Sequence, residues 1–300
     1  MAITIPAAYI DTFESTVRHL AQQKISRLRV AVTEVFRQSE SHMWDRLQAS
    51  NYRVKTARAA SPTGGDQASA AGSTDGLVWS RRNTLIKTYD TGEIVGREEI
   101  LQMLIDPLSA VTENLAMNMR RAVDDVIING FYDNALTDGG SADVFPAGQK
   151  VGATTVPISI DLLLQVKEIF ANNDIDPDEL ITLVIGPAQQ RTLMQLLEVT
   201  SGDYQNSKAL ATGYLPNFLG FNIIVSNRLG MSTVQPGVGT DLYCTAFTRR
   251  AIGLHVASDI MAKVAERPDL SFDWQLYCML SMDAVRVENE HIVQLLVDNT

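Results

Sequence analysis

The chain has 300 residues, of which 45% are apolar and 20% are charged, the composition of an ordinary globular protein with a sizeable core. No apolar run approaches the ~18 residues of a transmembrane helix, which excludes a membrane span of this kind. The formal net charge of -10 argues against a nucleic-acid binder, because phosphate contact requires clustered Lys and Arg.

The charge is unevenly distributed along the chain. Residues 1–60 contain nine Lys or Arg and five Asp or Glu, a balance of +4, so residues 61–300 carry -14. This basic segment indicates self-association through complementary surfaces or an arm facing something anionic, and a merely solvated helix face explains it equally well. Two cysteines, Cys244 and Cys278, are too few for a disulfide scaffold and lack metal-site spacing, so we expect free buried thiols.

The first residues, MAITIPAAYIDTFE, lack a basic region followed by an apolar one, so we expect no secretory signal in them. We therefore expect the protein to work in the compartment where it is made.

Residues 7–25 place apolar side chains on one side of a short amphipathic helix. Residues 28–36 (LRVAVTEVF) are rich in β-branched side chains and predict an extended segment.

Residues 57–76 (ARAASPTGGDQASAAGSTDG) are small and polar and predict a long mobile loop. Candidate strands flank this loop at 52–56 and 78–89, so we predict an extended hairpin that reaches away from its own domain. An isolated hairpin is only marginally stable in water, and we expect another subunit to hold it. Trp79 is either an aromatic anchor of this arm or, as is commoner for Trp, a packed core residue.

Residues 107–133 form the organising element of the predicted fold, a long helix with one buried stripe. Asp106 and Pro107 begin it with a cap and a preset backbone angle. The apolar positions are Leu108, Val111, Leu115, Met119, Ala122, Val126 and Phe131, with Val123, Ile127 and Gly130 beside them. The opposite, polar face carries Glu113, Asn114, Asn118, Arg120, Arg121, Asp124 and Asp125. Because ordering a backbone costs about 1–2 kcal/mol per residue, the stripe needs a sheet or other helices against it.

An α/β section follows a connection over 135–157 that is rich in Gly, Pro and Ala. Its expected elements are a helix at 159–172 capped by Ser159, a turn at 173–178, a strand at 180–185 buried on both faces, a helix at 187–199, and strands at 223–225 and 242–247. The expected C-terminal strands are 251–264, 272–287 with a central part at 275–281, and 288–298. We expect these strands to pack under the long helix, which leaves 155–250 as an inserted subdomain.

No constellation of residues predicts a catalytic, cofactor or metal site. LVIGPAQQR (183–191) looks like a phosphate-binding crossover, but it has a single Gly and Pro187 removes an amide, so we interpret it as a structural turn. Ligand spacing is absent among the histidines, which are His19, His42, His255 and His291. A solvated helix face, a turn and a strand edge explain the acidic groups, which are Asp124 with Asp125, 174–178, and Glu288 with Glu290. This absence favours a structural or binding protein over an enzyme.

Four blocks of the sequence resemble successive regions of the major capsid proteins of tailed bacteriophages. The first block is RNTLIKTYDTGEIVGREEILQMLIDPLSAVTENLAMNMRRAVDDVIING (82–130), with an IDP turn before an alanine-rich helix. The others follow in the same order: NDIDPDELITLVIGPAQQRTLM (173–194), EVTSGDYQNSKALATGYLPNFLGFNIIVSNRL (198–229) and GLHVASDIMAKVAERPDLSFDWQLYCMLSMDAVRVENEHIVQL (253–295). Together the blocks cover most of the chain, and their order and coverage make the resemblance far more specific than any single motif.

The resemblance implies an α+β fold, the Hong Kong 97-type capsid fold, which has an N-terminal arm, an extended β-hairpin loop (E-loop), a peripheral domain with a long spine helix, and an inserted α/β axial domain. The implied boundaries are 1–40 for the arm, 41–98 for the extended loop, 99–154 and 251–300 for the peripheral domain with its spine helix at 107–133, and 155–250 for the axial domain. Some relatives cross-link subunits through a Lys and an Asn, and no residue pair in this sequence supports that chemistry.

The resemblance also implies a function, that of a major capsid protein that self-assembles into an icosahedral head shell around the phage double-stranded DNA. The implied partners are other copies in hexamers and pentamers, a portal, scaffolding or decoration proteins, and DNA contacted non-specifically, with no membrane and no cofactor. The implied location is the virion capsid, assembled in the host bacterial cytoplasm. Two alternatives stay open: the shell of a cargo-holding nanocompartment with the same fold, and a small-molecule α/β enzyme, which rests only on the crossover at 180–200.

Overall fold

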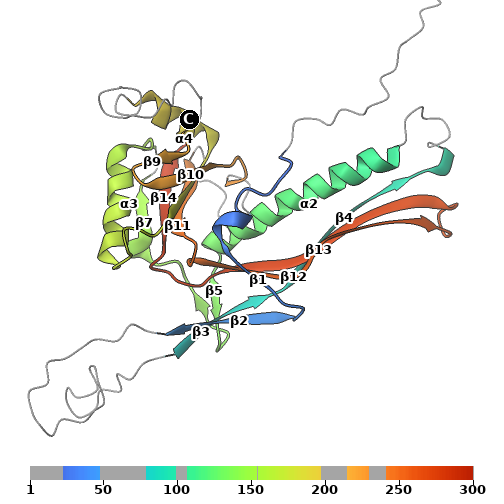
Figure 1. Cartoon of the computed structure of the whole chain (residues 1–300), viewed down its shortest axis with the longest axis horizontal. Coiled ribbons are helices and arrows are strands. Elements are labelled where there is room, and N and C mark those ends of the chain that lie inside the picture. Colours follow the sequence, from blue (N-terminus) through green and yellow to red (C-terminus); the bar gives the residue numbers. More distant parts are fainter. Residues whose placement is uncertain are drawn as a thin grey trace, which may run out of the picture. The chain divides into compact units, whose positions relative to one another are not determined.

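The structure is a computed structural model that describes residues 23–47, 79–98, 107–153, 155–196, 215–229 and 241–299 (Figure 1). The predictions for 52–56 and 57–76 lie outside these residues, as does the predicted helix at 7–25 apart from residues 23–25, which are not helical. No helix within the described ranges is long and apolar enough to cross a membrane.

The chain divides into two compact units. The smaller unit comprises Met1–Ile25, Tyr89–Arg121 and Ile260–Leu280, and the larger comprises Ser26–Thr88, Ala122–Asp259 and Ser281–Thr300. The domain boundaries implied by the resemblance stay a prediction.

The long helix α2 spans Pro107–Tyr132 and ends one residue before its predicted end. Its apolar stripe is buried as predicted, with Leu115, Met119, Val123, Val126, Ile127 and Phe131 all in the core. Near its C-terminus the helix packs tightly on strand β13 (Asp273–Arg286), because a Cβ placed on Gly130 would lie 2.8 Å from the Cβ of Ala284. One prediction is wrong: Asp124, expected on the solvent face, is completely buried.

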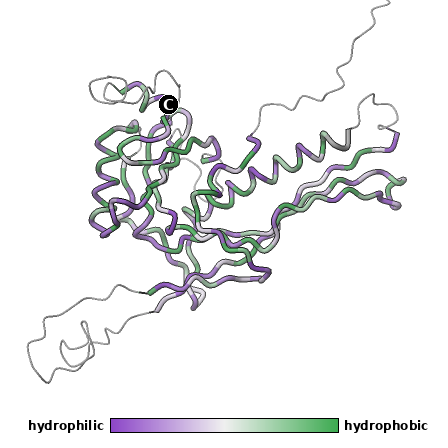
Figure 2. The backbone as a smooth tube through the Cα atoms, in the orientation of Figure 1, coloured by the Kyte–Doolittle hydropathy of each residue, from purple (hydrophilic) through white to green (hydrophobic). Residues whose placement is uncertain are grey.

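Six strands form the largest sheet, in the order β7-β14-β11-β8-β10-β9. They span Lys150–Gly152, Ile292–Asp298, Asp241–Thr248, Ile181–Ile185, Phe221–Val225 and Asn217–Phe218. The central strand β8 is buried at every residue, which confirms the prediction of a strand covered on both faces. Figure 2 shows the same strands as a mostly hydrophobic stretch of the backbone.

Two helices flank this sheet in Figure 1. Helix α3 spans Ile160–Asn172 and is capped as predicted, because the Ser159 hydroxyl accepts a hydrogen bond from the amide of Leu162 at 3.3 Å. Helix α4 spans Pro187–Gln195 and connects β8 to β10, which run parallel. The structure therefore contains the strand, turn and helix predicted around 183–191.

A second sheet has four strands in the order β2-β3-β5-β6. They span Ser41–Leu47, Trp79–Leu85, Ala135–Thr137 and Ala142–Asp143. Strands β2 and β3 pair antiparallel over their whole length, from Ser41 opposite Leu85 to Leu47 opposite Trp79. They form the described part of a hairpin. The sequence analysis missed β2, since it placed the first strand of the hairpin at 52–56.

A third sheet has the order β1-β12-β13-β4, with β1 at Thr33–Phe36, β12 at Ile252–Arg267 and β4 at Lys87–Val95. The interior place of β13 confirms the central position predicted for 275–281.

Two other predictions are wrong. Residues Arg29–Ala31 form a 3-10 turn (η1) and only 33–36 are extended. The strand predicted at 78–89 breaks at Ile86, whose amide donates to the carbonyl of Glu40, so β3 and β4 enter different sheets.

Candidate assembly surface

Strands β2 and β3 form a ribbon with two unlike faces, because residues paired across an antiparallel ladder point to the same side. The inner face carries His42, Trp44, Arg82 and Thr84. Trp44 packs on a buried cluster that consists of Ala135, Val285 and Val287. A Cβ placed on Gly253 would lie 2.5 Å from the Trp44 ring, so the glycine on β12 leaves the space that the indole needs. The inner face is thus part of the subunit core.

A pair of histidines lies beside this tryptophan. The His42 and His255 ring centroids are 5.3 Å apart, and the His42 ring meets Trp44 edge-on at 4.8 Å. His255 is completely buried, and its Nε2 donates to the carbonyl of Arg37 at 3.0 Å. Burial lowers the pKa of His42, and the neighbouring His255 and Arg37 lower it further. In the sequence 213 positions separate the two histidines, so no spacing rule predicts their contact.

Two arginines lock the short strands of this sheet to the end of α2. Arg82 pairs with Asp143 on β6. Arg286 is completely buried, and burial lowers its pKa to about 10, so it stays charged at neutral pH. Its guanidinium donates to the carbonyls of Phe131, Asp133 and Asp143 and, at 2.6 Å, to the side chain of Asn289. A buried charge with this many acceptors fixes the orientation of the strands that supply them.

The outer face of the ribbon includes Met43, Leu47, Trp79 and Leu85, which are all exposed, the cross-strand pair of Asp45 and Arg81, and the polar residues Ser41 and Asn83. The Trp79 side chain is 68% exposed, so within the described structure it is no core residue. Leu47 and Trp79 are direct partners in the ladder, and the Asp45 and Arg81 side chains meet at 2.7 Å. Large apolar side chains gathered on one face are the signature of an interaction surface.

The N-terminal part of the described chain is held to α2 by Asp124. The Asp124 carboxylate accepts hydrogen bonds from the Ser26 hydroxyl and from the amides of Arg27 and Leu28, the latter at 3.1 and 3.2 Å. The next residue along the helix, Asp125, pairs with Arg228. The sequence analysis missed this role because an Asp on a helix normally faces water. These contacts position the segment that leads into η1 and β1.

Comparison with known proteins decides the family. The model of the family described as phage capsid protein matches residues 5–299, nearly the whole chain. The chain belongs to this family. No curated protein sequence matches it.

Solved structures show the fold of this capsid protein independently. The capsid of the Cyanophage P-SCSP1u matches with a TM-score of 0.73 and 13% identity over 98% of this chain and 94% of that chain. A structure from Mycobacterium phage Che8 matches with a TM-score of 0.72 and 14% identity over 97% of this chain and 98% of that chain. The capsid of Cyanophage Pam1 matches with a TM-score of 0.69 and 10% identity over 99% of this chain and 98% of that chain. The fold is therefore the α+β capsid fold of the Hong Kong 97 type.

Family and fold together give this capsid protein its function: it is a major capsid protein, and its copies associate into the shell of a phage virion. The described residues contain no cluster of three potential metal ligands among His, Cys, Asp and Glu. Cys244 and Cys278 are free and buried as predicted, and burial raises the pKa of Cys244 to about 12. At Gly186, in the turn between β8 and α4, a Cβ would lie 2.5 Å from the Gln189 side chain, so the close packing of this turn requires a glycine.

Proposed function

We propose that the shell is icosahedral and built of pentamers and hexamers, with residues 155–250 grouped around their axes. In this arrangement the β2–β3 hairpin lies over a neighbouring subunit, and residues 1–40 tie adjacent subunits together. The observation that carries the proposal is the unlike pair of faces on the ribbon, one packed into the core and one presenting Trp79, Leu47 and Met43 to solvent. Many weak contacts of this kind suffice for closure, because each added interface multiplies the avidity.

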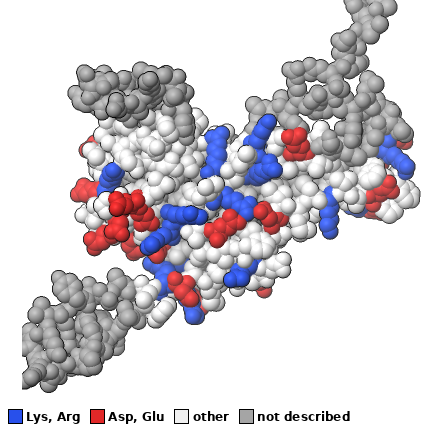
Figure 3. Space-filling view, in the orientation of Figure 1, with Lys and Arg blue, Asp and Glu red and all other residues white. Residues whose placement is uncertain are grey.

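We further propose that the shell assembles in the host bacterial cytoplasm and encloses double-stranded DNA, with a portal and with scaffolding or decoration proteins as partners. On the face drawn in Figure 3, basic and acidic side chains are interspersed over the described residues. Together with the net charge of -10, this supports a shell that does not grip densely packed DNA. Free subunits should bind DNA weakly and only at low salt, and nanomolar binding at physiological salt would refute this part of the proposal.

The experiment that tests the proposed function is negative-stain microscopy of the protein after gentle lysis of expressing cells. Closed shells, or rings of five and six subunits, are the expected result. A uniform monomer or dimer that fails to assemble under every salt and scaffolding condition would contradict the proposal and return attention to the α/β enzyme alternative. The contents of the shells separate the remaining two candidates, since a nanocompartment holds a protein cargo and a phage head holds DNA and carries a portal.

A further inference from the structure

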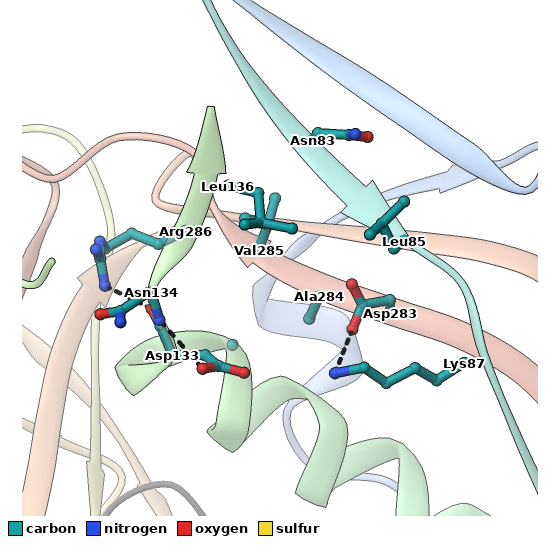
Figure 4. A pocket seen from close by; sticks show the side chains of 11 residues that line it. Asn83, Leu85, Lys87, Asp133, Asn134, Leu136, Asp283, Ala284, Val285 and Arg286 are labelled. Carbon is teal, nitrogen blue, oxygen red and sulfur yellow. Dashed lines mark hydrogen bonds and ion pairs between the residues drawn. The ribbon is translucent and has the colours of Figure 1, made fainter. Parts of the chain in front are cut away.

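A cavity of about 100 Å³ opens where β3, β4, β13 and the C-terminal end of α2 meet in the larger unit. The residues that matter for its chemistry are Asn83, Leu85, Lys87, Asp133, Leu136 and Asp283 (Figure 4). A water molecule takes up ~30 Å³ of liquid, so the cavity has room for the head group of a side chain.

Carboxylates and side-chain amides line the cavity, those of Asp133, Asp283, Asn83 and Asn134. The Asp283 carboxylate is largely buried, and Oδ1 of Asn83 is buried without a hydrogen-bond partner among the described residues. The Arg286 guanidinium also lines the cavity, and it is already used by the carbonyls and the amide described above. A cavity with a buried carboxylate and an unpaired amide oxygen favours a cationic ligand that donates hydrogen bonds to both.

Lys87 is only a distant ionic partner of the Asp283 carboxylate. Its ammonium lies 4.0 Å from the carboxylate, beyond hydrogen-bond distance, and its side chain is 61% exposed (Figure 4). Burial raises the pKa of Asp283 to about 6, and Lys87 and the hydrogen bonds from the backbone amides of Ala284 and Leu85 offset this only in part. The carboxylate is therefore charged at neutral pH, and no Lys or Arg of the described residues lies within hydrogen-bond distance of it.

Apolar side chains line the cavity beside its polar groups, namely Leu85, Leu136 and Val285. Leu85 is 45% exposed and lies at the edge of the outer face of the ribbon. Arginine and lysine side chains have this same division, an apolar stem that ends in a charged head. We propose that the cavity binds a basic side chain of a second copy of the chain, with the stem along the leucines and the head on Asp283 and Asn83.

This proposal rests on the proposed function, which surrounds each subunit with further copies. The source of the side chain is a second copy because the first 60 residues have a surplus of +4 and the cavity lies next to the outer face of the hairpin. It adds to that function a specific ionic contact between subunits at the base of the hairpin.

The test compares the critical concentration for shell assembly, followed by light scattering, for wild type and Asp283→Asn between pH 5 and 8. At pH 7.5 we expect the variant to need about tenfold more protein, the size of one charge-assisted hydrogen bond. As pH falls through about 6, Asp283 takes up a proton and wild type should approach the variant. The charged groups around it are Lys87 from β4, Asp133 from the end of α2 and Arg286 from β13, whereas Asn83, Leu85 and Leu136 are uncharged.

Two further variants keep the result unambiguous. Glu266→Gln removes an exposed acidic charge from β12, outside the hairpin and outside residues 155–250, and should leave the critical concentration and its pH dependence unchanged. Lys87→Met removes the competing cation, so it should assemble at least as well as wild type. If Lys87→Met weakens assembly as much as Asp283→Asn does, the pair within the subunit is what matters, and the proposal is overturned.

Folding does not confound the main comparison. The raised pKa of Asp283 means that the folded subunit disfavours its charge, so Asp283→Asn should be as stable as wild type or more stable above pH 6. If wild type forms shells and Asp283→Asn matches it at every pH, the cavity does not bind a basic side chain. If wild type never forms shells, the proposed function fails instead, and the two failures are thus distinguishable.

Discussion

Asp124 shows how a single buried carboxylate can order a segment nearly a hundred residues away in sequence. Replacing it with alanine leaves the Ser26 hydroxyl and the amides of Arg27 and Leu28 without their acceptor. We expect Asp124→Ala to lower the free energy of unfolding by about 2–3 kcal/mol, measured by urea denaturation of the subunit. The neighbouring Asp125→Ala is the matched control, because its pair with Arg228 is partly exposed and should be worth less than about 1 kcal/mol. Equal losses in the two variants would show that Asp124 is no special anchor.

Gly152 makes a second residue-scale prediction. Its φ is +88°, and a Cβ there would lie 2.2 Å from the carbonyl oxygen of Leu296 on the paired strand β14. Gly152→Ala should therefore lower the free energy of unfolding by about 2–3 kcal/mol, through strain and a displaced β7. Gly148→Ala, a few residues earlier in open space, should change it by less than about 0.5 kcal/mol under the same denaturation assay. A tolerated Gly152→Ala would mean that β7 can move away from β14 at little cost.

At the scale of elements, the sequence predicts those whose burial follows their periodicity. Helix α2 and strand β8 have their apolar residues where a buried stripe or a doubly covered strand requires them. Strand β2 was missed because its pattern is inverted: Met43 and Leu47 face solvent, whereas His42 points inward. A pattern rule assigns apolar side chains to the core, so it fails on a strand such as β2, where Met43 and Leu47 are exposed.

The candidate site was predictable only in part. The sequence predicted a hairpin that includes Trp79, and the β2–β3 pairing confirms its described part, whereas the expectation that another subunit holds it stays a prediction. The partners on the inner face were not, because Gly253 and His255 come from a strand more than 200 residues away and have no local signal there. The Asp283 cavity could not be predicted for the same reason. Its residues come from strands and a helix end that only the folded chain brings together.

The buried stripe of α2 gives a test of the helix as a unit. Val123 is 1% exposed, so Val123→Asp places a carboxylate in the core without a partner, and we expect the protein to be insoluble or unfolded. Asn118→Asp introduces the same charge on the exposed face of the same helix and should fold normally. The measurements are the soluble fraction after expression and the far-UV circular dichroism spectrum. A soluble Val123→Asp that still forms shells would mean that the wrong face has been assigned to the core.

At the scale of the whole molecule, one side of the ribbon packs into the subunit core, whereas on the other side apolar side chains are exposed within the described structure. A monomeric protein gains nothing from such a surface, whereas a subunit in a closed shell can bury it against a neighbour many times over. The stability of the subunit and the stability of the shell should therefore respond to different residues of the same two strands.

Substitutions of Trp79 and Trp44 separate the stability of the subunit from the stability of the shell. Trp79→Ala removes an exposed ring, so the free energy of unfolding of the isolated subunit should stay within about 0.5 kcal/mol of wild type. Shell assembly should weaken markedly, because aromatic residues often dominate the energy of an interface. Trp44→Ala is the opposite case: its ring fills the space over Gly253, and its loss should cost the subunit about 3 kcal/mol. The measurements are urea denaturation of subunits and sedimentation of assembled shells. If Trp79→Ala assembles as well as wild type, the outer face is not what holds neighbouring subunits together, and the hairpin must act through other residues.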